Sequence, residues 1–119
     1  MKSKQEYRIP IATTHSVEII WVKDILYLEG MENYSRVILA NGDSIVSTTS
    51  LGRHYEELRN VGFYQCHKSY LVNFEHILRY KKQGDVELIT SHQIPIARRR
   101  KDLFLDALKA WCNELSANR

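Results

Sequence analysis

Short runs of β-branched and aromatic residues, separated by turn-forming residues, occupy most of the chain and predict β-strands. The expected strands are residues 8–13, 17–21, 25–29, 34–39, 44–48, 63–66, 71–73, 77–80, 86–89 and 93–97. Pro10 and Pro95 lie beside β-branched residues, which suits edge strands or the starts of strands.

Turn-forming residues between these runs predict three hairpins. Residues 14–16 join the first two strands, and residues 82–85, which contain Gly84, join two later ones. The strongest signal is Asn41-Gly42, because both residues tolerate the positive φ that a two-residue type I′ turn requires. This turn is expected to join strand 35–39 to strand 44–48.

Helical spacing of apolar residues appears in two places. Leu51, Tyr55 and Leu58 share one face of a short helix. Ser50 is placed to cap the start of this helix, and Gly62 is suited to end it.

The second helix is expected at the C-terminal end and has about four turns. Its apolar stripe consists of Phe104, Leu108, Trp111 and Leu115. We expect Trp111 to close the core rather than to face a partner. The predicted fold class is mainly β, with one short central helix and a C-terminal helix.

Length and composition are those of one globular domain spanning residues 1–119. The chain has 119 residues, of which 44% are hydrophobic and 26% charged, so a real core is expected and wholesale disorder is excluded. No apolar run approaches the roughly 18 residues of a membrane span, and no secretory leader is recognised. The two cysteines lie far apart, which indicates a reduced, intracellular setting.

Positive charge is concentrated in one part of the chain, although the net charge is only +3. Asp85 and Glu87 are the only negative residues between positions 79 and 101. Local excess of one sign attracts a polyanion. The positive residues there are Arg79, Lys81, Lys82, Arg98, Arg99, Arg100 and Lys101.

Metal binding and catalysis find little support in the sequence. Cys66-His67 lacks the paired ligands, a few residues apart, that zinc sites show. No nucleophile motif occurs, and the glycines are dispersed rather than gathered into a phosphate-binding loop. We therefore expect neither an enzyme nor a cofactor. Without a resemblance, His67 is most simply a core histidine bonded to backbone.

Four consecutive cations, residues 98–101, open the C-terminal helix. Cations at a helix N-terminus oppose the macrodipole by about 0.3–1 kcal/mol each, so another interaction is expected to compensate them. One interpretation is a solvated charge run balanced by Asp102 and Asp106. The other is contact with phosphates or bases, for which arginine forks are suited. Asn33-Tyr34-Ser35-Arg36 is a weaker segment of the same kind.

Taken together, three segments resemble the LytTR family of DNA-binding output domains. They are 25–30 (ILYLEG) followed by Asn33-Tyr34, then 67–73 (HKSYLVN), then 94–99 (IPIARR), and the match runs from about residue 11 to 108. The resemblance implies an elongated fold of stacked antiparallel sheets whose loops enter successive major grooves of double-stranded DNA. It also implies a cytoplasmic bacterial transcription regulator that occupies paired direct repeats, two copies at a time, and is often attached to a receiver domain.

The resemblance also implies which residues contact DNA. The expected contact residues are Asn33, Tyr34, Ser35, Arg36, His67, Lys68, Ser69, Arg98, Arg99, Arg100 and Lys101. Among them, Ser35 or Arg36, Lys68 and Arg99 are the base-reading candidates. Two departures stand out: Ala97 replaces a common serine, and Lys68 stands where arginine or asparagine is frequent.

The alternative from another functional class is a β-rich protein-interaction or signal-sensing domain. Its basic patch would then meet acidic protein or lipid headgroups. Preference for one DNA sequence distinguishes the first interpretation from the second.

Overall fold

A computed structural model describes residues 4–117, with side chains as far as Glu114. The strands are β1 (Arg8–Ala12), β2 (Val17–Trp21), β3 (Ile25–Met31), β4 (Tyr34–Leu39), β5 (Ser44–Ser47), β6 (Phe63–His67), β7 (Tyr70–Asn73), β8 (Ile77–Lys81), β9 (Asp85–Leu88) and β10 (Gln93–Pro95). The α-helices are α1 (Leu51–Leu58) and α2 (Lys101–Ala117). Short 3-10 turns are η1 (Val22–Asp24), η2 (Arg59–Val61), η3 (Phe74–His76) and η4 (Arg98–Arg100).

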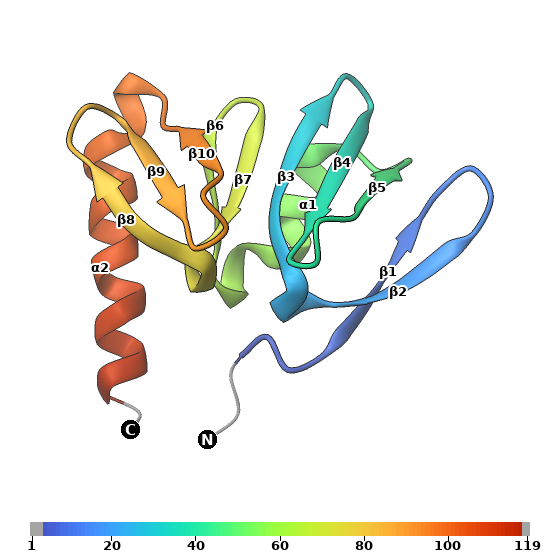
Figure 1. Ribbon diagram of the computed structural model, residues 1–119, viewed down its shortest axis with the longest axis horizontal. Coiled ribbons are helices and arrows are strands. Elements are labelled where there is room, and N and C mark those ends of the chain that lie inside the picture. Colours follow the sequence, from blue (N-terminus) through green and yellow to red (C-terminus); the bar gives the residue numbers. More distant parts are fainter. Residues whose placement is uncertain (1–3, 118–119) are drawn as a thin grey trace.

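The strands form three antiparallel sheets, as the predicted fold class requires. A five-stranded sheet in the order β5-β4-β3-β7-β6 lies in the middle (Figure 1). A three-stranded sheet, β10-β9-β8, lies on one side of it with α2, and the β1-β2 hairpin projects on the other. The whole extends over 39 × 35 × 25 Å.

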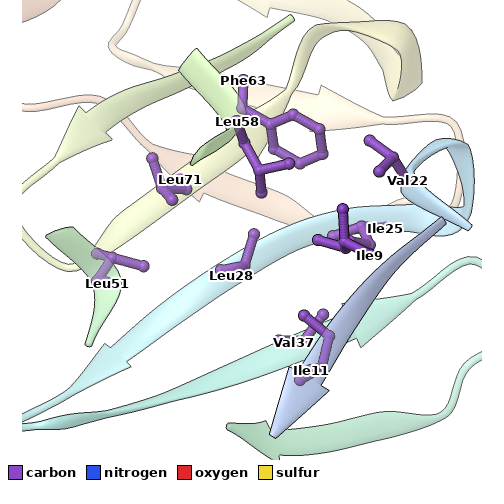
Figure 2. Packing of buried hydrophobic residues seen from close by; sticks show 10 residues of the cluster. All are labelled: Ile9, Ile11, Val22, Ile25, Leu28, Val37, Leu51, Leu58, Phe63 and Leu71. Carbon is purple, nitrogen blue, oxygen red and sulfur yellow. The ribbon is translucent and has the colours of Figure 1, made fainter. Parts of the chain in front are cut away.

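One apolar cluster joins the central sheet to α1 and the β1-β2 hairpin (Figure 2). Leu51 and Leu58 reach it from α1, as their helical spacing predicts. Its buried members are Ile9, Ile11, Val22, Ile25, Leu28, Val37, Leu51, Leu58, Phe63 and Leu71. The hairpin and α1 thus share one face of the sheet.

A second cluster lies between the central sheet, the three-stranded sheet and α2. Phe104 is its centre, with ring centroids 5.5 Å from Tyr64, 5.6 Å from Phe74 and 6.2 Å from Tyr80. Trp111 is buried in the same cluster, which confirms the prediction that it closes the core. The side chain of Leu115, the last member of the predicted stripe, lies outside the described residues.

The hairpin after β4 forms where Asn41-Gly42 predicts it, but the predicted type I′ turn is wrong. The N–H of Gly42 donates to the carbonyl of Leu39 at 3.0 Å, and Leu39 pairs onward with Asp43. Gly42 has a φ of +93°, whereas the φ of Asn41 is negative. The loop is therefore a three-residue turn closed by a left-handed glycine, a common alternative to the two-residue form.

The caps of α1 follow the sequence with one difference. The Ser50 side chain accepts a hydrogen bond from the N–H of Arg53, as predicted. Gly62 has a left-handed φ of +98°, but it follows the 3-10 turn η2 rather than α1 itself. The turn adds Arg59–Val61 to the end of the helix before the chain enters β6.

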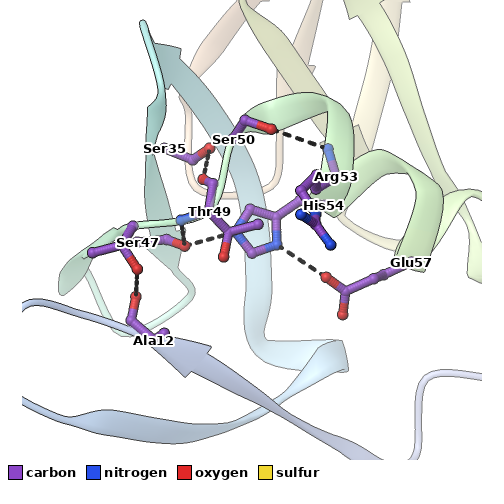
Figure 3. Close-up of polar contacts among 9 residues, drawn as sticks. Ala12, Ser35, Ser47, Thr49, Ser50, Arg53, His54 and Glu57 are labelled. Atoms are coloured by element: carbon purple, nitrogen blue, oxygen red, sulfur yellow. Dashed lines mark hydrogen bonds and ion pairs between the residues drawn. The ribbon is translucent and has the colours of Figure 1, made fainter.

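A buried histidine links α1 to the end of β5 (Figure 3). Nε2 of His54 lies 2.8 Å from Oγ of Ser47, which also accepts the N–H of Thr49. The Ser47 hydroxyl proton is therefore free to be donated to Nε2, which requires a neutral imidazole. Nδ1 of His54 lies 3.8 Å from Oε1 of Glu57. Burial lowers the pKa of His54 below its ordinary value.

Acid is expected to destabilise the fold through His54. The unfolded chain takes up a proton at the ordinary histidine pKa of about 6.5, whereas the folded chain does so only at lower pH. The contribution of His54 to the free energy of unfolding is thus present above about pH 6.5 and is lost as the pH falls below that value. Urea unfolding at pH 7.5 and 5.5 should show a smaller loss for His54→Gln than for wild type. Equal losses would contradict this account.

Candidate nucleic-acid interface

The three segments expected to contact DNA lie along one edge of the molecule. They are the β3-β4 turn, the β6-β7 turn and the link from β10 to α2, all at the upper edge of Figure 1. Hydrogen bonds join them: the N–H of Gly30 donates to Ser69 at 2.8 Å, and that of Ala97 donates to Cys66 at 2.8 Å. Residues far apart in sequence therefore form one continuous surface.

The arginine run forms a tight turn at this edge. The N–H of Arg100 donates to the carbonyl of Ala97 at 2.8 Å, so Arg98 and Arg99 occupy the middle of the turn. Both side chains are exposed. Within residues 4–117, neither guanidinium has an ion pair or hydrogen bond, so both are free to meet an anion.

The two residues after this pair are partly engaged in the scaffold. Nη1 of Arg100 donates to the carbonyl of Gln65 at 2.6 Å, which ties the turn to β6. Nζ of Lys101 lies 3.4 Å from the carbonyl of Gln83 in the β8-β9 turn. Both side chains are half-buried. These contacts give both cations a polar partner in the scaffold, and the two charges still add to the positive field of the edge.

The β6-β7 turn is held from within. Nδ1 of His67 accepts the N–H of Ser69 at 3.1 Å, and its ring packs against Tyr70 with centroids 5.6 Å apart. Nε2 of Gln65 approaches the carbonyl of Lys68 at 3.4 Å. His67 and Ser69 are half-buried, whereas Lys68 is exposed at the tip. The turn therefore presents Lys68 outward.

The β3-β4 turn and the start of β4 expose three of the four predicted contacts, and the fourth must be corrected. Asn33, Tyr34 and Arg36 are exposed. Ser35 is fully buried, and its hydroxyl donates to the carbonyl of Thr49 at 2.8 Å (Figure 3). Because side chains alternate along a strand, Ser35 faces inward when Tyr34 and Arg36 face outward. Ser35 is a scaffold residue and is not available to read bases.

Glu29 is a residue of this surface that the sequence did not single out. Strand register places it between Arg36 on β4 and Tyr70 on β7. Its carboxylate accepts the Tyr70 hydroxyl at 3.2 Å and lies 4.0 Å from the Arg36 guanidinium. Burial, and then this hydrogen bond, raise the pKa of Tyr70. Only the pairing of the strands brings Glu29 to Arg36.

The cations of the β8-β9 hairpin are unequal in availability. Glu87 pairs with both Arg79, at 3.5 Å, and Lys81, at 3.6 Å. Lys81 also donates to the side chain of Gln93 at 2.9 Å. Lys82, in the turn, is exposed and has no such partner among residues 4–117. Lys82 therefore extends the free positive charge of the edge beyond Arg98 and Arg99.

Cys66 belongs to the scaffold beneath these loops. It is fully buried, its thiol contacts the carbonyl of Pro95 at 3.5 Å, and burial raises the pKa of Cys66 to about 12.

Between residues 4 and 117, no three side chains are grouped as metal ligands, and no helix is long and apolar enough to cross a membrane.

Thiol labelling should distinguish the two cysteines. Cys112 is exposed, whereas Cys66 is buried with a raised pKa. Since the thiolate is the reacting form, iodoacetamide at pH 8 is expected to modify Cys112 quickly and Cys66 only after denaturation. Mass spectrometry of labelled peptides measures both. Rapid labelling of Cys66 in the native protein would show that the packing beneath the β6-β7 turn opens readily.

Comparison with known proteins agrees with this geometry. The family model for the LytTr DNA-binding domain matches residues 15–109. The fold is similar to that of a LytTr DNA-binding domain of a methyl-accepting/DNA response regulator from Bacillus cereus, with a TM-score of 0.72 and 20% identity over 86% of this chain and 96% of that chain. A search of curated proteins finds no match. Because the family match covers most of its length, the chain belongs to the LytTR family of DNA-binding domains.

Proposed function

We propose that the chain is a sequence-specific double-stranded DNA-binding domain that regulates bacterial transcription in the cytoplasm. The supporting observation is the edge at which three loops are hydrogen-bonded together and present Arg98, Arg99 and Lys68, whose side chains have no ion pair or hydrogen bond among the described residues 4–117. Positive side chains gathered on one edge complement the phosphate backbone of DNA in charge.

Base reading is assigned to the exposed side chains at the tips. Arg98 and Arg99 carry planar forks that can make two hydrogen bonds to O6 and N7 of guanine in the major groove. We assign neighbouring positions to Lys68 and Arg36, Lys68 with less geometric stringency because its ammonium is a flexible point charge. Asn33, in the β3-β4 turn, and Tyr34, the first residue of β4, complete the set.

Phosphate contact is assigned to the flanks of the same edge. Lys82 lies in the β8-β9 turn, and Lys101 is tied to the backbone of that turn. These side chains, with Arg100, would position the domain on the duplex without carrying sequence information. His67 and Ser69 help to shape the turn that carries Lys68.

Two copies on paired direct repeats, and a receiver domain in the same polypeptide, complete the proposal. Both rest on the family resemblance. A receiver would place the DNA-binding edge under the control of phosphorylation, as the output half of a two-component response regulator. Size analysis of complexes on one-site and two-site duplexes tests the number of copies.

The experiment that tests the function is selection of bound duplexes from a random pool, followed by titration at several salt concentrations. We expect one enriched sequence, and affinity for it should fall with a log–log slope of about −0.9 per phosphate neutralised. Lys82→Ala should flatten that slope by roughly one unit, whereas Lys109→Ala, an exposed lysine on α2, should not. Equal affinity for heparin and every duplex would instead favour the protein- or lipid-binding alternative.

A further inference from the structure

Strand β2 carries an apolar surface that neither the core nor the DNA-binding edge uses. Its alternate residues Val17, Ile19 and Trp21 are 59%, 53% and 41% exposed. The hairpin that bears them projects from the central sheet, at the side of the molecule remote from α2 (Figure 1). Three large apolar side chains in a row on one free face are unusual for a domain surface.

The backbone groups of the same residues also point outward. At one end of the hairpin the N–H of Val22 donates to the carbonyl of Tyr7 at 2.9 Å, and at the other end the N–H of Thr13 donates to the carbonyl of Ser16 at 2.8 Å. Tyr7–Val22 and Thr13–Ser16 are therefore hydrogen-bonded pairs of the ladder. Bonded and non-bonded pairs alternate along an antiparallel ladder, so the N–H and C=O groups of residues 17, 19 and 21 face away from β1. Pro10 lies opposite Ile19, which agrees, since proline has no N–H to bond inward.

The two edges of the hairpin differ in how well they are protected against pairing with a further strand. On β1, Pro10 removes one donor, and the carbonyl of Ala12 accepts the N–H of Thr48 at 2.9 Å. The sequence of β2, VEIIW, has no proline, glycine or lysine, and Glu18 is its single charge. Natural edge strands that must stay unpaired usually carry prolines or charged residues, especially lysine, that prevent pairing with another strand. Among residues 4–117, no strand pairs with the outer edge of β2, which is therefore open to another strand.

We propose that β2 pairs antiparallel with β2 of a second copy of this chain, about a twofold axis at Ile19. In this register Ile19 faces its own copy, and Val17 faces Trp21 of the other copy on both sides of the axis. All outward N–H and C=O groups of the three residues are then paired, and their side chains form one continuous apolar face. Pairs of aromatic with β-branched residues are favourable across strands.

The Trp21 side chain is held ready for this contact. The guanidinium of Arg8 lies 5.5 Å from its ring centroid and the ammonium of Lys23 lies 5.4 Å from it. Cations over an aromatic ring restrict its movement, so less side-chain freedom is lost when the second strand arrives.

A five-residue strand buries less surface than the 1,200–2,000 Å² or so of a stable interface, so association of the free domain should be weak. A twofold contact also differs from the relation between neighbours on direct repeats, which face the same way. The β2 contact therefore joins free domains, or domains bound at separate DNA sites. It is independent of the proposed DNA contacts.

Sedimentation equilibrium over a range of protein concentrations tests the pairing. We expect reversible monomer–dimer association of the wild type that Ile19→Lys weakens at least tenfold, because two ammonium groups would meet at the axis. Ile89→Lys is the matched control, since Ile89 is an isoleucine of similar exposure, 59%, outside β2. A wild type that stays monomeric to millimolar concentration, or equal weakening by both variants, would overturn the proposal.

Two further variants separate strand pairing from general stickiness. Ile19→Pro removes an outward N–H without touching the β1-β2 ladder, and should also weaken association. Ile19→Cys with Cys112→Ser should form a disulfide-linked dimer under mild oxidation, because directly paired residues have Cα atoms about 5.5 Å apart. The same oxidation of Ile89→Cys with Cys112→Ser should leave monomer. Single-site DNA affinity should be unchanged in Ile19→Lys, which keeps this test separate from that of the proposed function.

Discussion

Replacing Arg98 and Arg99 together with alanine is expected to abolish the preference for the selected DNA sequence while leaving weak binding to any duplex. Both side chains project from the middle of the turn between Ala97 and Arg100. The turn is fixed to β6 through the N–H of Ala97 and the guanidinium of Arg100. A rigid base of this kind lets an arginine fork meet a guanine at a set angle.

The size of the effect follows from the number of bases read. Each two-bonded arginine–guanine contact contributes about 1–3 kcal/mol of discrimination, which is about a 5- to 150-fold loss of the specific-to-scrambled affinity ratio. The family resemblance favours Arg99 as the reader, and the structure leaves both arginines exposed. The single variants Arg98→Ala and Arg99→Ala therefore show how much of the loss of this ratio each arginine accounts for.

Fluorescence anisotropy at one fixed salt concentration measures the ratio, and circular dichroism checks the fold. Lys68→Ala should reduce affinity with a smaller loss of preference, because lysine is a point charge. Arg53→Ala is a control, since Arg53 is an exposed arginine on α1 outside the three loops proposed to contact DNA. A double variant that keeps the wild-type ratio would remove the arginine turn from base reading.

The pattern of the chain predicts the elements well because each rests on local chemistry. Hairpins, the Ser50 cap and the stripe that buries Phe104 and Trp111 depend on neighbours within a few residues. The type I′ turn is the local feature that fails. Asn41 tolerates a positive φ but is not required to adopt one, and a three-residue loop closed by Gly42 satisfies the same strands.

The candidate interface is less predictable, since its residues meet only through tertiary pairing. Ser35 looks available in the sequence, yet the inward face of β4 and the carbonyl of Thr49 take it into the core. Glu29 gains its place beside Arg36 from strand register. The four cations form one run in the sequence, but carbonyls of β6 and of the β8-β9 turn engage Arg100 and Lys101. Arg98 and Arg99 have no such contact in the part of the chain that the structure describes.

Gly62→Ala is expected to be among the most destabilising single-methyl changes in this chain. A Cβ at this position would lie 2.8 Å from Cζ2 and 2.9 Å from Cη2 of Trp111, and 3.0 Å from Nε2 of Gln5. The backbone there has a φ of +98°, which costs a residue with a Cβ about 1–2 kcal/mol. Overpacking against a buried ring adds typically about 1–3 kcal/mol.

The expected sum is a fall of about 2–5 kcal/mol in the free energy of unfolding, measured by urea titration. Gly52→Ala is the matched control: Gly52 lies in α1 with open space around it, so alanine should stabilise by up to about 1 kcal/mol. In a Trp111→Phe background, which lacks the two clashing ring atoms, Gly62→Ala should cost less. The remaining cost would be that of the backbone, so the pair of measurements separates the clash from the conformation. An equal cost in both backgrounds would mean that Trp111 does not limit this position, and the close approach of Trp111 to Gly62 would have to be reconsidered.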